Sequence, residues 1–176
     1  MQKPENLKVV MAFGTFDLFH AGHENYLKQA KELGDYLIVV IARDETVRKI
    51  KGEASVHNEN ERFKNVKASG IAEKVILGYK GDKYKVLKKF RPNVIALGYD
   101  QFVFTQRLDK TLIDMKLNAD VVRLQPYFPQ IYKSSLLKKN LPEENGSELN
   151  RDAVLSENDQ ELNSIKNFEP KSKALL

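Results

Sequence analysis

Gly14-Thr15-Phe16-Asp17-Leu18-Phe19-His20-Ala21-Gly22-His23 joins two segments of opposite character. The apolar run 7–13 before it is typical of a buried β-strand, and the amphipathic run 24–33 after it is typical of a helix. In open α/β sheets, ligands bind where a parallel strand ends and turns into a helix. The free N–H groups and the dipole of that helix favour an anion there. His20 and His23 lie in this turn, which indicates a phosphate that undergoes chemistry.

Strand and helix patterns alternate along the chain to about residue 140. Apolar runs predict strands at 7–13, 36–42, 74–78, 93–98 and 120–124. Helical patterns are expected at 24–33, from 43 onward with Asp44 as N-cap, and at 59–69, 83–90 and 104–117. The run 36–42 is continuously apolar, as in a strand covered on both faces. The alternation predicts an α/β fold, a Rossmann-like doubly wound parallel sheet of about five strands.

Charge divides the chain into two parts, a body (residues 1–140) and a polar, acidic tail (residues 141–176). The chain has 176 residues and a net charge of +5, but the tail holds eight acidic and four basic side chains. The tail therefore carries −4 and the body +9, and we expect the tail to be mobile or weakly helical. A basic body suits an anionic small molecule such as a nucleoside triphosphate. Specific nucleic-acid binding is disfavoured, because the lysines are dispersed and no nucleic-acid-binding motif accompanies them.

Composition also bears on location and on the kind of catalysis. No apolar run approaches the roughly 20 residues of a membrane span, and the first residues lack the order of a signal peptide. The chain has no cysteine, which excludes disulfides and thiolate catalysis and fits a cytoplasmic setting.

Gly14-Thr15-Phe16-Asp17 followed by His20-Ala21-Gly22-His23 resembles the GTFD…HxGH signature of the cytidylyltransferase-like nucleotidyltransferases. The resemblance spans roughly residues 9–139 and implies a fold of the HxGH type. It also implies an enzyme that moves a nucleotidyl group from a nucleoside triphosphate to a phosphorylated acceptor and releases pyrophosphate. Mg²⁺ or another divalent cation on the phosphate oxygens is implied as cofactor, and a homodimer is possible because relatives often dimerise.

The resemblance assigns roles to the residues of the first turn. His20 and His23 are expected to be catalytic, donating to the phosphates and stabilising the pentacovalent α-phosphorus. The triphosphate is expected to lie against Gly14, Thr15 and Phe16, and Asp17 either orients the loop or helps to organise a metal ion. Gly22 would let the backbone approach the nucleotide. Lys51, or Lys49 in the same run, would reach the phosphates as a flexible point charge.

Three later segments complete the expected site. Arg62 has either an acceptor-phosphate or a helix-packing role. Gly98 would let the base lie against the backbone, while Asp100 holds the ribose or the loop. Ser134 and Ser135 resemble the late serine motif of the family, whose hydroxyls bind the β- and γ-phosphates, with a simple N-cap as the alternative for Ser134. The chain departs from the family at this motif, since Tyr132-Lys133 occupies its first position and Lys138 and Lys139 stand where relatives have arginine.

Other interpretations of the two histidines stay open at this point. They would also fit ordinary surface or helix-capping residues. A zinc site needs a third and a fourth ligand, and His57 is the only other histidine. We therefore predict no protein-bound metal cluster.

The acceptor is suggested by three segments that resemble archaeal-type FAD synthases, which adenylylate FMN. These segments are 42–47, 96–101 and the GxxGDK-like run 78–83. Glycerol-phosphate cytidylyltransferases usually carry two acidic residues where this chain has Tyr99-Asp100. Many archaeal members have C-terminal cysteines, and this chain has none. We expect ATP or CTP as donor and favour FMN as acceptor. The alternatives are a cytidylyltransferase for glycerol 3-phosphate or a similar alcohol, and a nucleotide-binding regulator without turnover.

Overall fold

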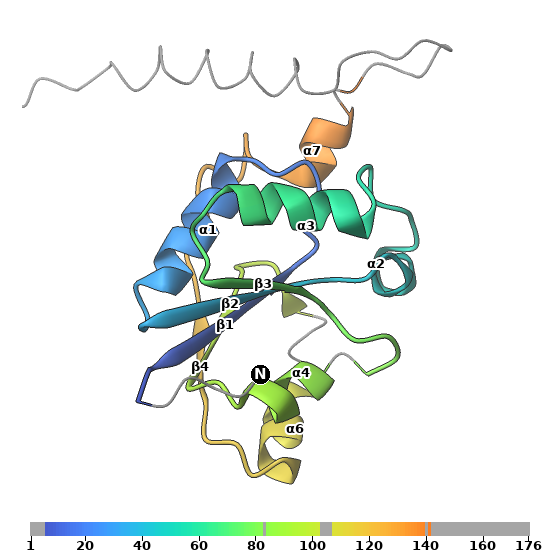
Figure 1. The fold of residues 1–176 in the computed structure, drawn as a ribbon. Helices are drawn as coiled ribbons and strands as arrows, with labels where there is room; N and C mark the ends of the chain where they lie inside the picture. Colours follow the sequence, from blue (N-terminus) through green and yellow to red (C-terminus); the bar gives the residue numbers. More distant parts are fainter. Residues whose placement is uncertain (1–5, 83, 103–106, 140, 142–176) are drawn as a thin grey trace, which may run out of the picture. The chain divides into compact units, whose positions relative to one another are not determined.

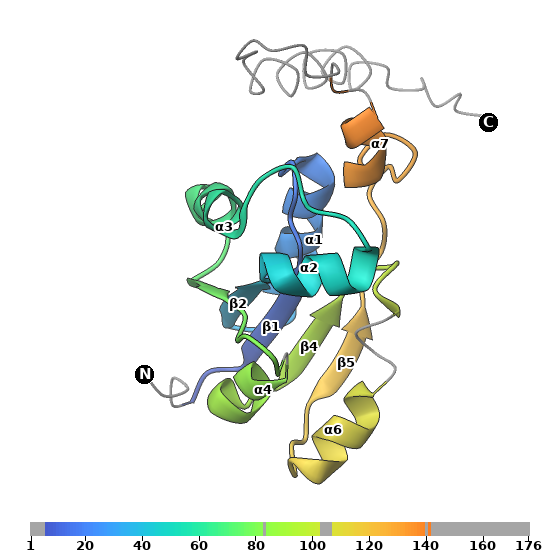
Figure 2. The ribbon, with the colours of Figure 1, turned by 90° about the vertical axis from the view of Figure 1, so that its right-hand side faces the viewer.

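The computed structural model describes residues 6–82, 84–102, 107–139 and 141. Five parallel strands form one sheet in the order β3-β2-β1-β4-β5 (Figures 1 and 2). The strands are β1 (Val9–Gly14), β2 (Tyr36–Ile41), β3 (Lys74–Leu77), β4 (Val94–Leu97) and β5 (Asp120–Arg123). The expected α/β fold with a five-stranded parallel sheet is confirmed.

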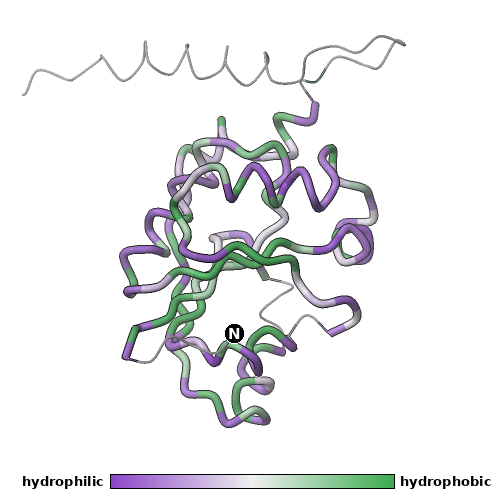
Figure 3. Tube along the Cα trace, in the orientation of Figure 1, coloured by the Kyte–Doolittle hydropathy of each residue, from purple (hydrophilic) through white to green (hydrophobic). Residues whose placement is uncertain are grey.

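Helices cover both faces of the sheet. The helices with defined bounds are α1 (Ala21–Lys31), α2 (Asp44–Lys51), α3 (Glu59–Ala68), α4 (Lys85–Phe90), α6 (Leu108–Asp114) and α7 (Ser134–Lys139). In Figure 1, α1 and α3 lie above the sheet while α4 and α6 lie below it. The apolar strands run between these two layers, as the hydropathy colours of Figure 3 show.

Alternation along β1 builds the two cores. Val9, Met11 and Phe13 pack with side chains of α4 and α6, whereas Val10 and Ala12 pack with side chains of α1 and α3. Because successive strand residues point to opposite faces, a strand that is buried on both faces must be apolar throughout. This explains the continuous apolar runs in the sequence.

The order of the strands reverses between β1 and β4, and the two strands separate at their carboxyl ends. β1 pairs with β2 up to Gly14, but it pairs with β4 only from Val10 to Ala12. Such a reversal leaves a crevice in which doubly wound sheets bind ligands. The turn after β1 and the turn after β4 face this crevice.

Some boundaries differ from the sequence-based prediction. α1 begins at Ala21, and His20 is its N-cap with an extended backbone (φ −143°). The expected N-cap role of Asp44 is wrong, because Arg43 caps α2 and the Asp44 carboxylate instead accepts hydrogen bonds from Arg62 and from the Glu59 N–H. Of the expected helix 104–117, α6 covers 108–114, and residues 104–106 lie outside the described residues.

The acidic tail also lies outside the described residues, apart from Leu141. The division into 1–140 and 141–176 and the weak helicity of the tail therefore stay predictions. In the part of the chain that the structure describes, no helix is long and apolar enough to cross a bilayer.

Candidate active site

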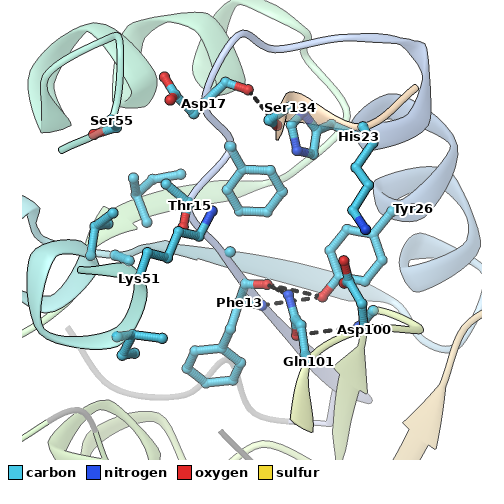
Figure 4. A pocket seen from close by; sticks show the side chains of 18 of the residues that line it. Phe13, Thr15, Asp17, His23, Tyr26, Lys51, Ser55, Asp100, Gln101 and Ser134 are labelled. Atoms are coloured by element: carbon cyan, nitrogen blue, oxygen red, sulfur yellow. Dashed lines mark hydrogen bonds between the residues drawn. The ribbon is translucent and has the colours of Figure 1, made fainter. Parts of the chain in front are cut away.

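A cavity of about 630 Å³ opens at the carboxyl edge of the sheet, over the crevice between β1 and β4 (Figure 4). Every residue that the sequence marked as a site candidate lines this cavity except Arg62 and the alternative lysine Lys49. The lining candidates are Gly14, Thr15, Phe16, Asp17, His20, Gly22, His23, Lys51, Gly98, Asp100, Ser134 and Ser135. The topology thus brings together residues that are up to 121 positions apart in the sequence.

The turn after β1 has a strained backbone. Phe16 and Leu18 have positive φ angles of 55° and 48°, and both side chains are buried. The Phe16 ring folds back onto Gly14, where an added Cβ would lie 2.7 Å from the ring. Strain of this kind persists where the surrounding packing enforces it, and it is concentrated at functional sites. Gly14 is therefore required by the packing of Phe16.

Asp17 holds a neighbouring loop in place. Its two carboxylate oxygens accept hydrogen bonds from the backbone N–H groups of Val56 (2.8 Å) and His57 (2.9 Å). The side chain is buried. Of the two roles expected for Asp17, this geometry supports orientation of the loop between α2 and α3.

The two histidines of the turn stack on each other. The ring centroids of His20 and His23 are 3.8 Å apart, with an angle of 21° between the rings. His20 Nε2 lies 3.4 Å from the Ser134 hydroxyl. Within the described part of the chain, the buried Nδ1 atoms of both histidines have no hydrogen-bond partner. Two buried imidazoles therefore keep unused hydrogen-bonding capacity beside the cavity.

Burial keeps both histidines neutral in the free protein. It lowers the pKa of His20 to about 4 and lowers the pKa of His23 well below its ordinary value. The nearby His20 and Lys51 lower the pKa of His23 further. A phosphate placed beside the pair would oppose this effect, because an adjacent negative charge favours the imidazolium form. The histidine pair can therefore take up a proton, and with it positive charge, when a negatively charged triphosphate lies beside it.

Lys51, the last residue of α2, extends into the cavity toward Thr15 (Figure 4). Lys49 does not line the cavity, since its ammonium group pairs with Glu45 (2.5 Å) on the exposed side of α2. Of the two lysines, Lys51 is the one placed to reach a phosphate. Lys138 also lines the cavity, and its ammonium group donates to Glu53 (3.1 Å) and to the Ala54 carbonyl (2.8 Å).

Arg62 is a packing residue in this structure. Its side chain is fully buried and donates to the carbonyls of Thr15 (2.6 Å), Ala42 (2.9 Å) and His57 (3.0 Å). It also donates to the Asp44 carboxylate (2.6 Å). Of the two roles expected for Arg62, this geometry supports helix packing, because the guanidinium is turned into the fold and joins the ends of β1 and β2 to α3.

Two side chains that the sequence did not reveal fill the gap between β1 and β4. The Gln101 amide donates to the Phe13 carbonyl (2.6 Å) and accepts from the Gly98 N–H (3.2 Å). The buried Tyr26 hydroxyl donates to the Ala96 carbonyl (2.9 Å) and lies 3.3 Å from both the N–H and the carbonyl of Phe13. Together they satisfy backbone groups that strand pairing leaves free at this point. Figure 4 shows both side chains converging on Phe13.

The turn after β4 is held by Arg123, a residue that the sequence did not mark as part of the site. Arg123 donates to the carbonyls of Gly98 (2.8 Å) and Tyr99 (3.2 Å), and its guanidinium lies over the Phe102 ring at 4.8 Å. Asp100 in this turn is exposed and faces the cavity. Arg123 thus fixes the backbone from which Asp100 projects.

α7 closes the cavity opposite the sheet. The Ser134 hydroxyl donates to the Asp17 carbonyl (2.9 Å), a contact drawn in Figure 4. Ser134 is the first residue of α7 rather than the residue before it, so the simple N-cap alternative does not describe its position. Ser135 is exposed at the cavity.

The structure explains the glycine at position 22 by a contact other than the expected one with a nucleotide. A Cβ at this position would lie 2.9 Å from the Tyr132 Cβ and 3.0 Å from the His20 ring. In this structure the glycine lets Tyr132 and His20 approach the first turn of α1. Close approach of a nucleotide to Gly22 stays a prediction.

The residues described offer no metal cage of their own. No group of three or more histidine or carboxylate side chains within the described ranges is arranged to hold a metal ion. Asp17 is engaged by two backbone N–H groups. The donor set fits a Mg²⁺ ion that is carried by substrate phosphates and water, as this hard cation commonly is.

A family model described as cytidylyltransferase-like matches residues 11–146. The chain belongs to the cytidylyltransferase-like family. Similar proteins include the FAD synthases of Thermoplasma acidophilum and Pyrococcus horikoshii. The first is 39% identical over 76% of this chain and 94% of its own length, and the second is 40% identical over 78% and 90%.

Two solved structures share this fold. The lipopolysaccharide core biosynthesis protein from Thermoplasma volcanium superposes with a TM-score of 0.65 at 37% identity, covering 69% of this chain and 99% of that protein. A pantoate-β-alanine ligase from Francisella tularensis has a TM-score of 0.57 at 15% identity, which shows the fold alone. The match to the family includes the turn that carries both histidines.

Proposed function

We propose that this protein is an FMN adenylyltransferase, which transfers AMP from ATP to FMN and forms FAD and pyrophosphate. The observation that carries the proposal is the similarity to FAD synthases at 37–44% identity. The cavity agrees with it, because His20, His23 and Lys51 surround the end of β1. No covalent nucleophile is needed for this chemistry, which depends on positioning and on neutralisation of charge.

In the proposed reaction, an oxygen of the FMN phosphate attacks the α-phosphorus of ATP. The bond between the α-phosphorus and the bridging oxygen of the β-phosphate breaks, and pyrophosphate leaves with that oxygen. His20 and His23 donate N–H groups to the oxygens on which charge develops, and Lys51 adds a fixed cation. Ser134 and Ser135 bind the leaving phosphates. A divalent cation such as Mg²⁺, carried by the substrates, would add to the neutralisation of the phosphate charge.

The two sides of the cavity suit different substrates. On the β4 side, the lining includes Gly98, Asp100 and Gln101 together with the rings of Tyr99 and Phe102. On the α2 side, it includes Val47, which is buried, and Ile50, which is 47% exposed although it is a large apolar residue. We assign the ribose and base of ATP to the β4 side and the flavin ring to the α2 side. The assignment places both phosphate groups at the histidine pair between them.

The test combines donors and acceptors in one panel. ATP and CTP are each incubated with FMN, glycerol 3-phosphate, phosphoethanolamine or phosphocholine and Mg²⁺, and pyrophosphate release is measured together with the product. We expect ATP and FMN to give FAD. Turnover of CTP with glycerol 3-phosphate and none of ATP with FMN would refute the proposal in favour of the cytidylyltransferase alternative. Nucleotide binding without pyrophosphate release across the panel would indicate a regulator.

A matched pair of histidine variants links the activity to the site. His23→Asn removes a histidine that lines the cavity, whereas His57→Asn changes the histidine that does not line it. FAD formation is expected to collapse only in the first variant. Equal losses in both would indicate a general effect on folding rather than a role of the cavity.

A further inference from the structure

Five aromatic rings form a continuous stack through the site. The stack runs from Phe19 through His23, His20 and Tyr132 to Tyr127. Neighbouring ring centroids are 5.7, 3.8, 5.9 and 5.8 Å apart, and the angles between neighbouring rings are 15–21°. Nearly parallel rings at these separations match the offset-stacked arrangement that aromatic pairs prefer. The two histidines are therefore held on both sides by aromatic faces.

Of the two rings stacked on His20, Tyr132 is the one that comes from far away in the sequence. It follows β5, is 7% exposed, and lies two residues before α7, whereas His23, the other ring stacked on His20, belongs to α1. The Tyr132 Cβ sits over the bare backbone of Gly22. The ring contact and the glycine contact together fix Tyr132 against the first turn of α1.

The orientation of His20 lacks the usual support. A catalytic imidazole is commonly oriented by a carboxylate or carbonyl that accepts from one of its ring nitrogens. Within the described residues, His20 Nδ1 has no hydrogen-bond partner, and Nε2 has only the long 3.4 Å contact with Ser134. The plane of the ring must therefore be set mainly by its packing between His23 and Tyr132.

We propose that Tyr132 is a positioning residue for the reaction, which fixes the plane of the His20 imidazole by stacking and so directs its nitrogens toward the phosphates. This inference rests on the proposed function. It also gives a physical reason for the tyrosine at the position where the late serine motif departs from the family pattern. The aromatic ring performs this role, since it is the ring that stacks.

The experiment compares aromatic and aliphatic replacements of Tyr132. Tyr132→Leu removes the ring, and we expect kcat for FAD formation to fall about tenfold to a hundredfold, the scale expected for a displacement near 1 Å. KM for ATP and FMN changes less than threefold, because Lys51 and the serines are untouched. Tyr132→Phe and Tyr132→Trp keep a stacking ring and restore kcat to within about threefold of the wild type.

Two further variants make the outcome decisive. Tyr36→Leu is the control for general packing, because it removes a half-buried tyrosine at the opposite end of the sheet. We expect this variant to leave kcat unchanged. If Tyr132→Leu does not fold, Tyr132→Met fills the same space without a rigid plane and carries the same prediction. The proposal is overturned if kcat of the folded aliphatic variant stays within threefold of wild type, or if the phenylalanine variant loses as much as the leucine variant.

A second readout needs no turnover and so separates this inference from the proposed function. The Cε1–H proton of His20, assigned by its absence in His20→Asn, lies between two rings whose currents shift its NMR resonance. Tyr132→Leu should move this resonance while Tyr132→Phe leaves it near its wild-type position. An unmoved resonance in the leucine variant would contradict the stack, whereas a wild-type protein that shows the stack but forms no FAD would contradict only the proposed function.

Discussion

Replacing Arg62 by methionine should cost stability rather than substrate affinity. The guanidinium is fully buried and donates four hydrogen bonds, three of them to carbonyls of Thr15, Ala42 and His57. The fourth goes to Asp44, whose side chain is 30% exposed. Methionine fills a similar volume, but it leaves these acceptors without a donor.

The expected loss follows from the kind of group removed. Breaking a buried ion pair by deleting one partner costs about 3–5 kcal/mol, much of it from the groups left unpaired. We take the lower part of that range, about 3 kcal/mol, because water can reach the Asp44 carboxylate. For a domain with a free energy of unfolding of about 5–15 kcal/mol, this is a large fraction.

The assay is urea denaturation of Arg62→Met and Arg62→Lys beside a surface control. Lysine keeps the charge but loses the planar fork, so its loss should fall between those of methionine and wild type. Lys49→Met breaks the exposed pair with Glu45 and should leave the urea midpoint close to that of the wild type. The reasoning is refuted if Arg62→Met unfolds at the wild-type urea concentration while KM for FMN rises tenfold or more, since that is the behaviour of a phosphate ligand.

Three further predictions concern the cavity. His23→Asn should lower kcat about 100- to 1000-fold with a wild-type melting temperature, the scale of losing one transition-state donor; activity within a few-fold of wild type would remove His23 from catalysis. Because burial lowers the pKa of His20 from 6.5 to about 4, the unfolded chain binds a proton there that the folded chain does not. The free energy of unfolding should therefore be fully retained above pH 6.5 and fall by up to about 3 kcal/mol as the pH drops to 4, less steeply in His20→Asn; identical pH profiles would contradict this. Ile50→Asp should raise KM for FMN at least tenfold and leave KM for ATP unchanged. Ile113→Asp, at a residue of α6 that is 76% exposed, is the inert control. A rise in KM for ATP instead would place ATP, and not the flavin, on the α2 side of the cavity.

The sheet and the location of the site were predictable because they depend on local patterns. Continuous apolar runs indicated strands covered on both faces, and the turns at Gly14 and Gly98 follow two of those runs. Parallel strands end at one edge, so the residues after them had to meet there. The cavity lined by His20, Asp100 and Ser134 follows from this topology.

The contacts that hold the site depend on tertiary packing, and the sequence carries no local signal for them. The guanidinium of Arg62 is a group that commonly binds phosphate, yet its neighbours in space are three carbonyls that only the fold brings together. Gln101 and Tyr26 matter because β1 and β4 diverge after Ala12, a detail of strand register. Tyr132 reaches His20 only because the segment after β5 returns to the start of α1.

The most direct test of the account follows the phosphorus atoms of ATP during FAD formation. Wild-type protein is incubated with FMN, Mg²⁺ and ATP labelled with ³²P at either the α- or the γ-position, and flavins are separated from pyrophosphate. We expect the α-label to appear in FAD and the γ-label in pyrophosphate. Transfer of the γ-label to flavin, or the absence of labelled FAD while a cytidine nucleotide reacts with another phosphorylated acceptor, would contradict it.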